Sequence, residues 1–491
     1  MTAARRLRVW AAAHRRVLLV AGAGAGLVAV AAVAAVAGFL FFFRVGDDDC
    51  SGAGVSDEQA FKCIPTGVEA AGAGIPYLVW LVLPDVFPEY LPGPNGYASL
   101  GMIYEEGAER PIGVPRVDVG VIPRVGLNCA FCHTTTYRTS VEVEPVIVLG
   151  APGRIDLQGY LRFLFRVVDD PKFNGDTIVA AIERRKDLSP NEVILYKTLV
   201  VPAMKTALHE ERERFAYAER NPDQGYGRID PFNPPKFTAL GRPVDDTIGN
   251  SDFMSLWSLE GRTVLHWDGL QQSLEEAALS GMIGSGATAD SLEVDNILRL
   301  VDFVETLEPP DYPFPVDEDL AARGAEIFRG ECAGCHTPGT GRTGQLIPVE
   351  EVGTDRHRVD MWEAPDAKAY NDTFAAYPWG FEQFQDVDGY VAIPLDGLWI
   401  RAPYLHNGSV PNLEALLMPP EQRPAQFFRG YDVYDPTKVG FVSDVPEDPA
   451  TGQKWFLYDT SLPGNSNSGH RYGTLLSAEQ KRALIEYLKT Q

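Results

Sequence analysis

The chain has 491 residues, 45% of them hydrophobic and 22% charged, a composition typical of a folded protein with more than one domain. Its formal net charge is −24; residues 1–44 carry six Arg and no acid, so the remainder stands at −30 (−24 minus 6). This acidic body argues against nucleic acid or anionic lipid as a partner, because both are polyanions. It would suit a basic protein partner, although acidic surfaces often serve solubility alone.

The N-terminal residues 1–44 predict a membrane anchor. Arginines from Arg5 to Arg16 precede an uninterrupted apolar run, Val17 to Phe43, which is long enough to span a bilayer as one helix. The run ends without a small-x-small cleavage site, so we expect an uncleaved transmembrane helix, with a cleaved signal peptide as the alternative. The arginines predict a cytoplasmic N-terminus and place the bulk of the chain in the periplasm or an equivalent extracytoplasmic space.

Six cysteines divide into one pair and two motifs. Cys50 and Cys63 are close in sequence and are free to form a disulfide in an oxidising compartment. Such a bridge would contribute roughly 2–3 kcal/mol, mainly by restricting the unfolded chain.

The other four cysteines lie in two Cys-x-x-Cys-His motifs, which is the attachment signature of c-type haem. The first motif is Cys129, Cys132 and His133, and the second is Cys332, Cys335 and His336. Residues three apart on a helical turn share a face, so both sulfurs reach the porphyrin edge, and the adjoining histidine provides the proximal iron ligand. We therefore expect two covalently bound haem c groups. A zinc site built from both cysteine pairs is the alternative, but zinc gives no reason for a histidine directly after the second cysteine.

Between the motifs, the pattern predicts mainly helices. A short strand or hairpin is expected from Val141 to Leu149, and the loops at 225–233 and 265–269 are candidate site segments. The expected helices are Ile155–Val168, a helix from the Ser189 cap to about Phe215, one capped at Ser273, and Asp295–Leu307.

A stiff linker, Pro309–Pro315, marks the expected domain boundary. A helix, Asp319–Phe328, leads into the second motif, and a capping box at Ser477 begins a closing helix, Lys481–Thr490. Gly324 would let the first of these helices approach an aromatic such as Tyr487 closely, as in small cytochromes c. The predicted fold is mainly α: tandem cytochrome c-like haem domains (45–308 and 309–491) with long irregular loops, preceded by one transmembrane helix (1–44). The stretch between residues 340 and 470 is interpreted as a long insertion.

Several segments together resemble a known family. They are Asn128–Thr134, His266–Gly269, Leu398–Pro411, Gly430–Asp435 and Asn467–Gly473. This set, within residues 70–491, resembles the di-haem cytochrome c peroxidase superfamily, and within it the branch of bacterial haem rubber oxygenases. The Ala-Pro-Tyr-x-His-x-Gly segment is typical of the whole superfamily, and the Gly-His-x-Tyr-Gly ending points to the oxygenase-like branch.

The resemblance implies roles for particular residues. His133 and His336 match the proximal ligands, and His470 matches the distal ligand of a six-coordinate, electron-transferring second haem. Trp267 is similar in position to a tryptophan that lies between the haems and relays electrons. In this branch the first haem is open on its distal side, where dioxygen or peroxide chemistry occurs.

Alternative assignments stay open at this point. His406, Met361 and Met418 are rivals of His470 as sixth ligand, and Met204, Met254 or a lysine could close the first haem. Arg228 and Arg401 are candidate partners of haem propionates. Because the chain is shorter than typical rubber oxygenases and looks anchored, rubber cleavage is not carried over.

The expected function is that of a membrane-anchored periplasmic di-haem c-type cytochrome, an oxidoreductase acting on peroxide or dioxygen at the first haem, with the second as electron-transfer centre. Its expected partners are a redox protein or quinone-linked donor, a small oxidant and the membrane. The alternatives are a non-catalytic electron-transfer cytochrome, with both irons six-coordinate, and maturation of a partner protein by high-valent haem chemistry.

Overall fold

The computed structural model describes residues 50, 54–70, 72, 74–259, 262, 264–339 and 341–491. These residues form a mixed structure of helices and short strands, so the prediction of a mainly α fold is wrong. The strands are two to four residues long, which is too short for an alternating pattern to reveal most of them. The transmembrane helix expected at Val17–Phe43 falls outside the described residues. Among the residues described, no helix is long and apolar enough to cross a membrane.

The helices range from single turns to fourteen residues. They are α3 (Asp57–Cys63), α4 (Tyr77–Val86), α5 (Cys129–Cys132), α6 (Leu157–Val167), α7 (Gly175–Glu183), α8 (Pro190–Leu195), α9 (Val201–Arg214), α10 (Asn233–Thr238), α11 (Leu274–Gly284), α12 (Val294–Glu305), α13 (Glu318–Glu331), α14 (Ala333–His336), α15 (Val349–Val352), α16 (His357–Asp360), α17 (Ala364–Phe374), α18 (Leu413–Leu416) and α19 (Ala478–Leu488).

The strands pair antiparallel in one three-stranded sheet, ordered β1-β3-β2, and in two-stranded ribbons within the described chain. They are β1 (Ile75–Pro76), β2 (Arg116–Val119), β3 (Ile122–Val125), β4 (Thr134–Tyr137), β5 (Val146–Leu149), β6 (Arg228–Ile229), β7 (Ser251–Asp252), β8 (Leu346–Pro348), β9 (Gly389–Val391), β10 (Gln426–Arg429), β11 (Tyr434–Asp435), β12 (Gly440–Phe441) and β13 (Phe456–Asp459). The ribbons are β4-β5, β6-β7, β8-β9, β10-β13 and β11-β12.

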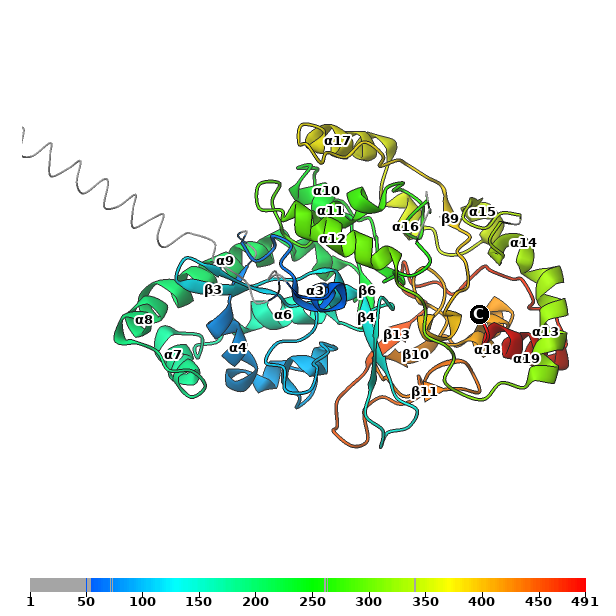
Figure 1. The fold of residues 1–491 in the computed structure, drawn as a ribbon, viewed down its shortest axis with the longest axis horizontal. Helices are drawn as coiled ribbons and strands as arrows, with labels where there is room; N and C mark the ends of the chain where they lie inside the picture. The colour runs from blue at the N-terminus through cyan, green and yellow to red at the C-terminus, as the bar shows by residue number, and fades with distance from the viewer. Residues whose placement is uncertain are drawn as a thin grey trace, which may run out of the picture.

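The molecule is elongated, with the two cysteine motifs in different halves (Figure 1). Helices α4 and α6–α9 form one end, α13 and α19 form the other, and the short strands β4, β10 and β13 lie between them. One hydrophobic core fills the first end around Trp80 and Phe163, and another surrounds Trp399 and Leu484 at the second end. Each motif therefore lies beside its own core.

Helices with clear caps follow the sequence prediction closely. Ser189 forms a capping box with Glu192 at the start of α8, and Ser477 forms another with Gln480 at the start of α19. The helix expected to run to about Phe215 passes through a π-helical turn at Tyr196–Val200 before continuing as α9. The expected strand near Val141–Leu149 is β5, which pairs with β4 directly after the first motif.

Helices α13 and α19 cross at Gly324, as the sequence predicts. A Cβ at Gly324 would lie 2.0 Å from the carbonyl oxygen of Ala483 and 2.7 Å from the Cβ of Tyr487. The ring of Phe328 packs 5.0 Å from that of Tyr487 on the same side. The absence of a side chain at Gly324 is therefore what lets the two helix backbones touch, about two turns before the second motif.

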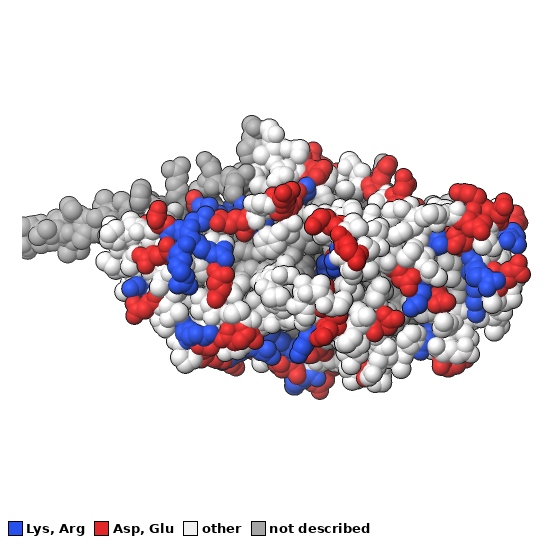
Figure 2. Space-filling model, turned by 90° about the horizontal axis from the view of Figure 1, so that it is seen from below, with Lys and Arg blue, Asp and Glu red and all other residues white. Residues whose placement is uncertain are grey.

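The disulfide predicted between Cys50 and Cys63 is present. It closes a loop that begins the described chain and ends α3, the helix that packs against α5 of the first motif. On the face shown in Figure 2, acidic and basic side chains are interspersed, so the described residues of this face form no uniformly acidic surface.

Candidate functional site

The first cysteine motif is a single helical turn held by Asn128. The Asn128 side chain accepts a hydrogen bond from the Ala130 N–H at 3.0 Å, which caps α5. Its amide donates to the carbonyl oxygens of Phe61 and Ile64, both at 3.1 Å, at the end of α3. The side chain is 2% exposed, so this anchoring is fully internal. It fixes the turn that carries Cys129 and Cys132.

His133, directly after this turn, has the tautomer that an iron ligand requires. Its Nδ1 lies 2.8 Å from the carbonyl oxygen of Met254, which can only accept, so Nδ1 carries the proton. Burial lowers the pKa of His133 to about 4, which keeps the ring neutral. The Nε2 lone pair is then free for a metal, and an accepting carbonyl behind the ring makes it a better ligand.

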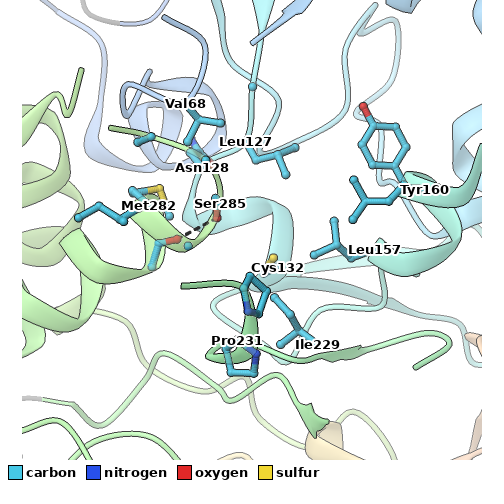
Figure 3. Close-up of a pocket in the computed structure, with 18 of the residues that line it drawn as sticks. Val68, Leu127, Asn128, Cys132, Leu157, Tyr160, Ile229, Pro231, Met282 and Ser285 are labelled. Atoms are coloured by element: carbon cyan, nitrogen blue, oxygen red, sulfur yellow. Dashed lines mark hydrogen bonds between the residues drawn. The ribbon is translucent and has the colours of Figure 1, made fainter. Parts of the chain in front are cut away.

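A cavity of about 1260 Å³ opens beside this turn and is lined by Cys129, Cys132 and His133. It exceeds the about 300–1,000 Å³ usual for small-molecule and cofactor sites. Most of its lining is apolar. Figure 3 shows Val68, Leu127, Leu157 and Met282 around the same space, with Cys132 at its edge.

Two buried polar atoms on the wall of this cavity have no hydrogen-bond partner among the described residues. They are His266 Nε2 and Arg262 Nη2, and both residues line the cavity. Burial lowers the pKa of His266 to about 4, so its ring is neutral. Buried polar atoms are normally hydrogen-bonded, so these two are available to a bound group. The carboxylates of a haem would accept from Arg262, and from His266 in its Nε2–H tautomer, so the residues present fit haem c.

The second motif follows α13 directly, with Cys332 ending that helix and α14 carrying Cys335 and His336. His336 Nδ1 lies 2.8 Å from the carbonyl oxygen of Ile393, so this ring has the same tautomer as His133. Burial lowers the pKa of His336 as well.

The His336 and His470 rings face each other at a distance suited to one shared metal. Their centroids are 6.3 Å apart, with an angle of 51° between the planes. Metal–imidazole bonds of about 2 Å, extended by about 1.1 Å to each ring centre, give about 6.2 Å between centroids. The donor pair therefore fits the two axial positions of a haem iron.

The loop that carries His470 is held by backbone contacts. His470 has φ of 42° and donates its N–H to the Val352 carbonyl oxygen at 2.8 Å. A Cβ on Gly469 would lie 2.2 Å from the backbone of Gly353, so only glycine fits there. Arg423, 5% exposed, donates to the carbonyl oxygens of Asn467, Gly469 and His470. These contacts fix a histidine in a conformation that costs about 1–3 kcal/mol.

The rival residues His406 and Met361 are held by other contacts, and Met418 contacts the arginine that also binds the His470 backbone. His406 is buried, stacks on Tyr390 at 4.0 Å, and has its Nε2 3.0 Å from the Tyr390 hydroxyl. Met361 is 1% exposed in an aromatic core with Trp362. The carbonyl oxygen of Met418 accepts from Arg423 Nε at 3.3 Å, in the loop that holds His470.

Several methionines line the first cavity, among them Met204, Met254 and Met282. Met254 provides the carbonyl behind His133, so its backbone lies on the proximal side. Met282, on α11, was not singled out from the sequence, and its side chain points into the cavity (Figure 3).

Of the arginines suggested as propionate partners, Arg228 is buried and Arg401 is partly buried. Arg228 is 0% exposed and donates to the Asn465 side chain at 2.8 Å. Arg401 donates to the carbonyl oxygens of Pro394 and Asp396, and its Nε has no partner. Arg401 thus lies beside the segment that contains Ile393.

Trp267 contacts both halves of the molecule. Its indole N–H donates to the Asp252 carbonyl oxygen at 2.7 Å, and its own carbonyl oxygen accepts from the Val391 N–H at 2.8 Å. Asp252 ends β7, two residues before Met254, and Val391 ends β9, two residues before Ile393. Trp267 therefore bridges the segments whose carbonyl oxygens accept from His133 and His336.

A duplicated segment, missed in the sequence, contains these contacts. Residues 252–279 and 391–418 share several described local features at a constant offset of 139 positions (391 minus 252). Positive-φ residues coincide in the two copies: Ser258 with Gly397, His266 with Leu405, and Gly269 with Gly408. The bridge between Leu265 and Gln271 is repeated between Tyr404 and Val410, and the N-caps Ser273 and Asn412 coincide at α11 and α18.

At this offset of 139 positions, Met254 and Ile393, whose carbonyl oxygens accept from His133 and His336, occupy equivalent positions in the two copies. Trp267 and His406 are equivalent in the same way. The second copy lies inside the stretch interpreted from the sequence as an insertion, so part of that stretch has a counterpart in the first half. The two cysteine motifs are 203 positions apart (336 minus 133), which is why an alignment on the motifs hides the repeat.

A zinc site finds no support in these positions. Among the residues that the structure describes, no group of three or more His, Cys, Asp or Glu is placed to hold a metal ion.

Comparison with known proteins agrees with a haem protein. Residues 389–429, from β9 to β10, match a family model described as "RoxA-like, cytochrome c-like". The chain is 31% identical over 286 residues to the uncharacterized protein y4iM of Sinorhizobium fredii (strain NBRC 101917 / NGR234), covering 49% of this chain and 64% of that protein. It is 25% identical over 506 residues to the uncharacterized protein y4iJ of the same organism, covering 81% of this chain and 82% of that protein.

The chain thus spans slightly less than two thirds of the first of these relatives. The family match supports the RoxA-like cytochrome branch of the expected resemblance and extends no support to the wider peroxidase superfamily. A cytochrome c-like segment of this type implies haem c as cofactor.

Proposed function

We propose that the protein is an extracytoplasmic di-haem c-type cytochrome with oxidoreductase activity. It acts on peroxide or dioxygen at its first haem, attached at Cys129 and Cys132. The second haem, attached at Cys332 and Cys335, transfers electrons to it.

The observation that carries this proposal is the difference between the two sites. Beside His133 lies a cavity of about 1260 Å³, whereas the ring of His336 has another imidazole, His470, 6.3 Å away. A site with two axial histidines suits electron transfer, and a site with one histidine and open space suits binding of a small oxidant. The two motifs, so similar in sequence, therefore support different tasks.

Residues around the first site hold and orient the cofactor. His133 Nδ1–H donates to Met254, which keeps Nε2 free as the axial donor. His266 and Arg262 provide buried donors for carboxylates, and the apolar wall with Val68 keeps water from the site. Haem c bound here would supply an iron that can reduce peroxide or activate dioxygen.

Trp267 is proposed to relay electrons between the sites. Its position supports this role, since it is hydrogen-bonded to both acceptor segments. The donor to the second site is proposed to be a redox protein or a quinone-linked carrier. The disulfide between Cys50 and Cys63 supports an extracytoplasmic location, because such bridges persist in oxidising compartments.

The second candidate is electron transfer without catalysis. The observation that favours it is Met282, whose thioether points into the first cavity (Figure 3). Thioether sulfur is a common sixth ligand of haem c. If Met282 binds the first iron, both irons are six-coordinate and the oxidant has no free position.

Electron paramagnetic resonance of the oxidised protein separates the candidates, after a pyridine haemochrome assay has counted two haems per chain. One high-spin and one low-spin ferric signal would support the catalytic proposal, and peroxide consumption should then be measurable. Two low-spin signals, one of which becomes high-spin in Met282→Leu, would support electron transfer. A count of one haem per chain would contradict both.

A further inference from the structure

The two proximal histidines are supported in the same way by equivalent segments. His133 donates to the Met254 carbonyl oxygen and His336 to that of Ile393, both at 2.8 Å. Each acceptor lies two residues beyond a short strand, β7 ending at Asp252 and β9 ending at Val391. The position of each strand end therefore sets the position of the carbonyl behind its histidine.

The strand ends are tied across the two copies by reciprocal hydrogen bonds. The Asp252 N–H donates to the carbonyl oxygen of His406 at 2.9 Å. The Val391 N–H donates to the carbonyl oxygen of Trp267 at 2.8 Å. Because Trp267 and His406 are counterparts, 139 positions apart (406 minus 267), each copy holds the strand end of the other.

One contact breaks this symmetry. The Trp267 indole N–H also donates to the Asp252 carbonyl oxygen at 2.7 Å. Its counterpart, His406, instead directs its ring to the Tyr390 hydroxyl at 3.0 Å. The Trp267 side chain thus binds the backbone at the end of β7, whereas the His406 ring contacts β9 through the Tyr390 side chain.

Every polar group of Asp252 therefore has a hydrogen-bond partner. Its N–H donates to His406, its carbonyl oxygen accepts from Trp267, and its carboxylate accepts from Arg429 at 2.9 and 3.0 Å. Trp267 itself packs against Val349 and Val359. This frame holds the peptide chain that leads directly to Met254.

We propose that Trp267 is a positioning residue for His133: its indole N–H fixes the strand end that presents the Met254 carbonyl to His133 Nδ1. This inference rests on the proposed function, because it concerns the axial ligand of the first haem. A firmly held acceptor makes the imidazole a stronger donor, which favours the oxidised iron. The effect is confined to the first haem, because the second depends on the Trp267 backbone and not on its side chain.

Two substitutions distinguish the contribution of the Trp267 indole N–H from that of its aromatic ring. Trp267→Phe keeps an aromatic ring and removes the donor. Trp267→His keeps a ring N–H, because Nε2 of histidine lies at the same place in its five-membered ring as Nε1 of tryptophan. Trp399→Phe is the matched control: Trp399 is 0% exposed and donates its Nε1–H to the Pro310 carbonyl oxygen at 2.9 Å, away from both acceptor segments.

The measurement is a redox titration of the full-length holoprotein, with each haem followed by its own spectroscopic signal. In Trp267→Phe we expect the first haem to become easier to reduce, by about threefold to tenfold in its reduction equilibrium, the low end of the effects of such outer partners. The second haem should be unchanged, and Trp267→His and Trp399→Phe should both match the wild type.

Unchanged midpoint potentials in Trp267→Phe would overturn the inference, even if electron transfer between the haems were slower, since that result assigns Trp267 to relay alone. Equal shifts in Trp267→Phe and Trp267→His would also overturn it, because the donor would then not be responsible. Both outcomes leave the proposed function standing. Loss of haem from the wild-type protein, by contrast, would contradict the proposed function itself.

Discussion

At the scale of single residues, one strained backbone position, His470, lies beside the second candidate haem. His470 has φ of 42°, in the left-handed region that histidine rarely adopts. Backbone outliers of this kind persist only where surrounding contacts over-determine them, and they cluster at functional sites. Arg423 and Gly469 provide such contacts here. The strain is consistent with a histidine that must present its ring to a ligand opposite His336.

Replacing His470 tests its role as an axial ligand. We expect His470→Ala to convert the low-spin signal of the second haem to high spin, because the axial position opposite His336 loses its imidazole. Absorption and electron paramagnetic resonance spectra of the oxidised protein would record this change. His357→Ala is a suitable control, since that side chain is 43% exposed and pairs with Asp355 rather than facing His336. A low-spin second haem in His470→Ala would assign the ligand to another residue.

His357 gives the structure a pH-dependent contribution to stability. Its Nδ1 lies 2.8 Å from the Asp355 carboxylate, and this hydrogen bond raises the pKa of His357 above its usual value of 6.5. A histidine whose pKa is raised by folding stabilises the protein below its unfolded pKa, and the stabilisation is lost as pH rises through the folded pKa. We therefore expect wild type to exceed His357→Gln in unfolding free energy most at about pH 6, with the difference shrinking toward pH 8.

Urea titrations at several pH values would measure this difference. An advantage of the wild type that stays constant from pH 6 to pH 8 would show that protonation of His357 is not coupled to folding. The Asp355 carboxylate responds at lower pH: burial opposes its ionisation, but the hydrogen bonds from His357 hold its pKa below the usual value. Its contribution is therefore present above about pH 4 and is lost only in stronger acid.

At the scale of elements, the crossing of α13 and α19 positions the second cysteine motif. Gly324→Ala should destabilise the protein by about 1–3 kcal/mol, because a Cβ there meets the Ala483 carbonyl oxygen at 2.0 Å and neither backbone can yield cheaply. Gly330 lies on the same helix with nothing within 4 Å of an added Cβ. Gly330→Ala should therefore stabilise by about 0.5–1 kcal/mol through helix propensity.

Chemical denaturation followed by the absorbance of the second haem would measure both variants. Equal effects of the two substitutions would show that close contact at Gly324 is not required. Opposite signs are the expected result, because the two glycines differ only in what surrounds them.

Elements with strong local signals could be predicted from the sequence, and elements fixed by distant contacts could not. Ser189 and Ser477 mark helix starts through their own capping boxes, and Gly324 marks a close crossing through the apolar face around it. Strands such as β7 and β9 have two or three residues and exist only because each pairs with a segment distant in sequence, so no local pattern identifies them. This is why the mainly α prediction failed.

The residues of the candidate site likewise divide into those with a local sequence signal and those without one. The cysteine motifs were evident because attachment chemistry demands particular side chains at fixed spacing. The acceptors behind the histidines, Met254 and Ile393, were not, because any residue can provide a backbone carbonyl. The repeat did leave a trace, since Leu274-Glu275 recurs as Leu413-Glu414 and Arg262 as Arg401 at the same offset. Alignment of the sequence with itself at offsets other than the 203 positions between the motifs is the comparison in which this repeat would appear.

At the scale of the whole molecule, the two halves are joined by buried polar contacts. Arg429 on β10 donates two hydrogen bonds to the Asp252 carboxylate on β7, and the two side chains are 4% and 7% exposed. Asp432 similarly accepts from Arg138 and Arg154, across the same boundary. Buried charges of this kind stabilise only as pairs, so each half depends on the other to satisfy its own groups. The halves are therefore expected to unfold together.

The pair of Arg429 and Asp252 gives this expectation a quantitative test. Arg429→Met should cost about 3 kcal/mol, the lower end of the usual range of about 3–5, because it leaves a buried carboxylate without its main partner. Arg228, whose Nε lies 3.9 Å from that carboxylate, limits the loss. Adding Asp252→Asn should recover part of the stability, since the uncompensated charge is then gone. Arg323→Met, which breaks a pair that is 60% and 69% exposed, should change little.

The cooperativity of unfolding shows whether Arg429→Met lowers the unfolding free energy of one half or of the whole molecule. If the reciprocal contacts bind the halves into one unit, the absorbance of each haem and the far-ultraviolet circular dichroism should report one coincident transition in wild type and in Arg429→Met. Separate transitions for the two haems in the wild type would show that the halves fold independently. In that case the hydrogen bonds at Asp252 and Val391 would be contacts between two independently folded domains. If the two halves form one cooperative unit, all of these signals must shift together in Arg429→Met and still report a single transition.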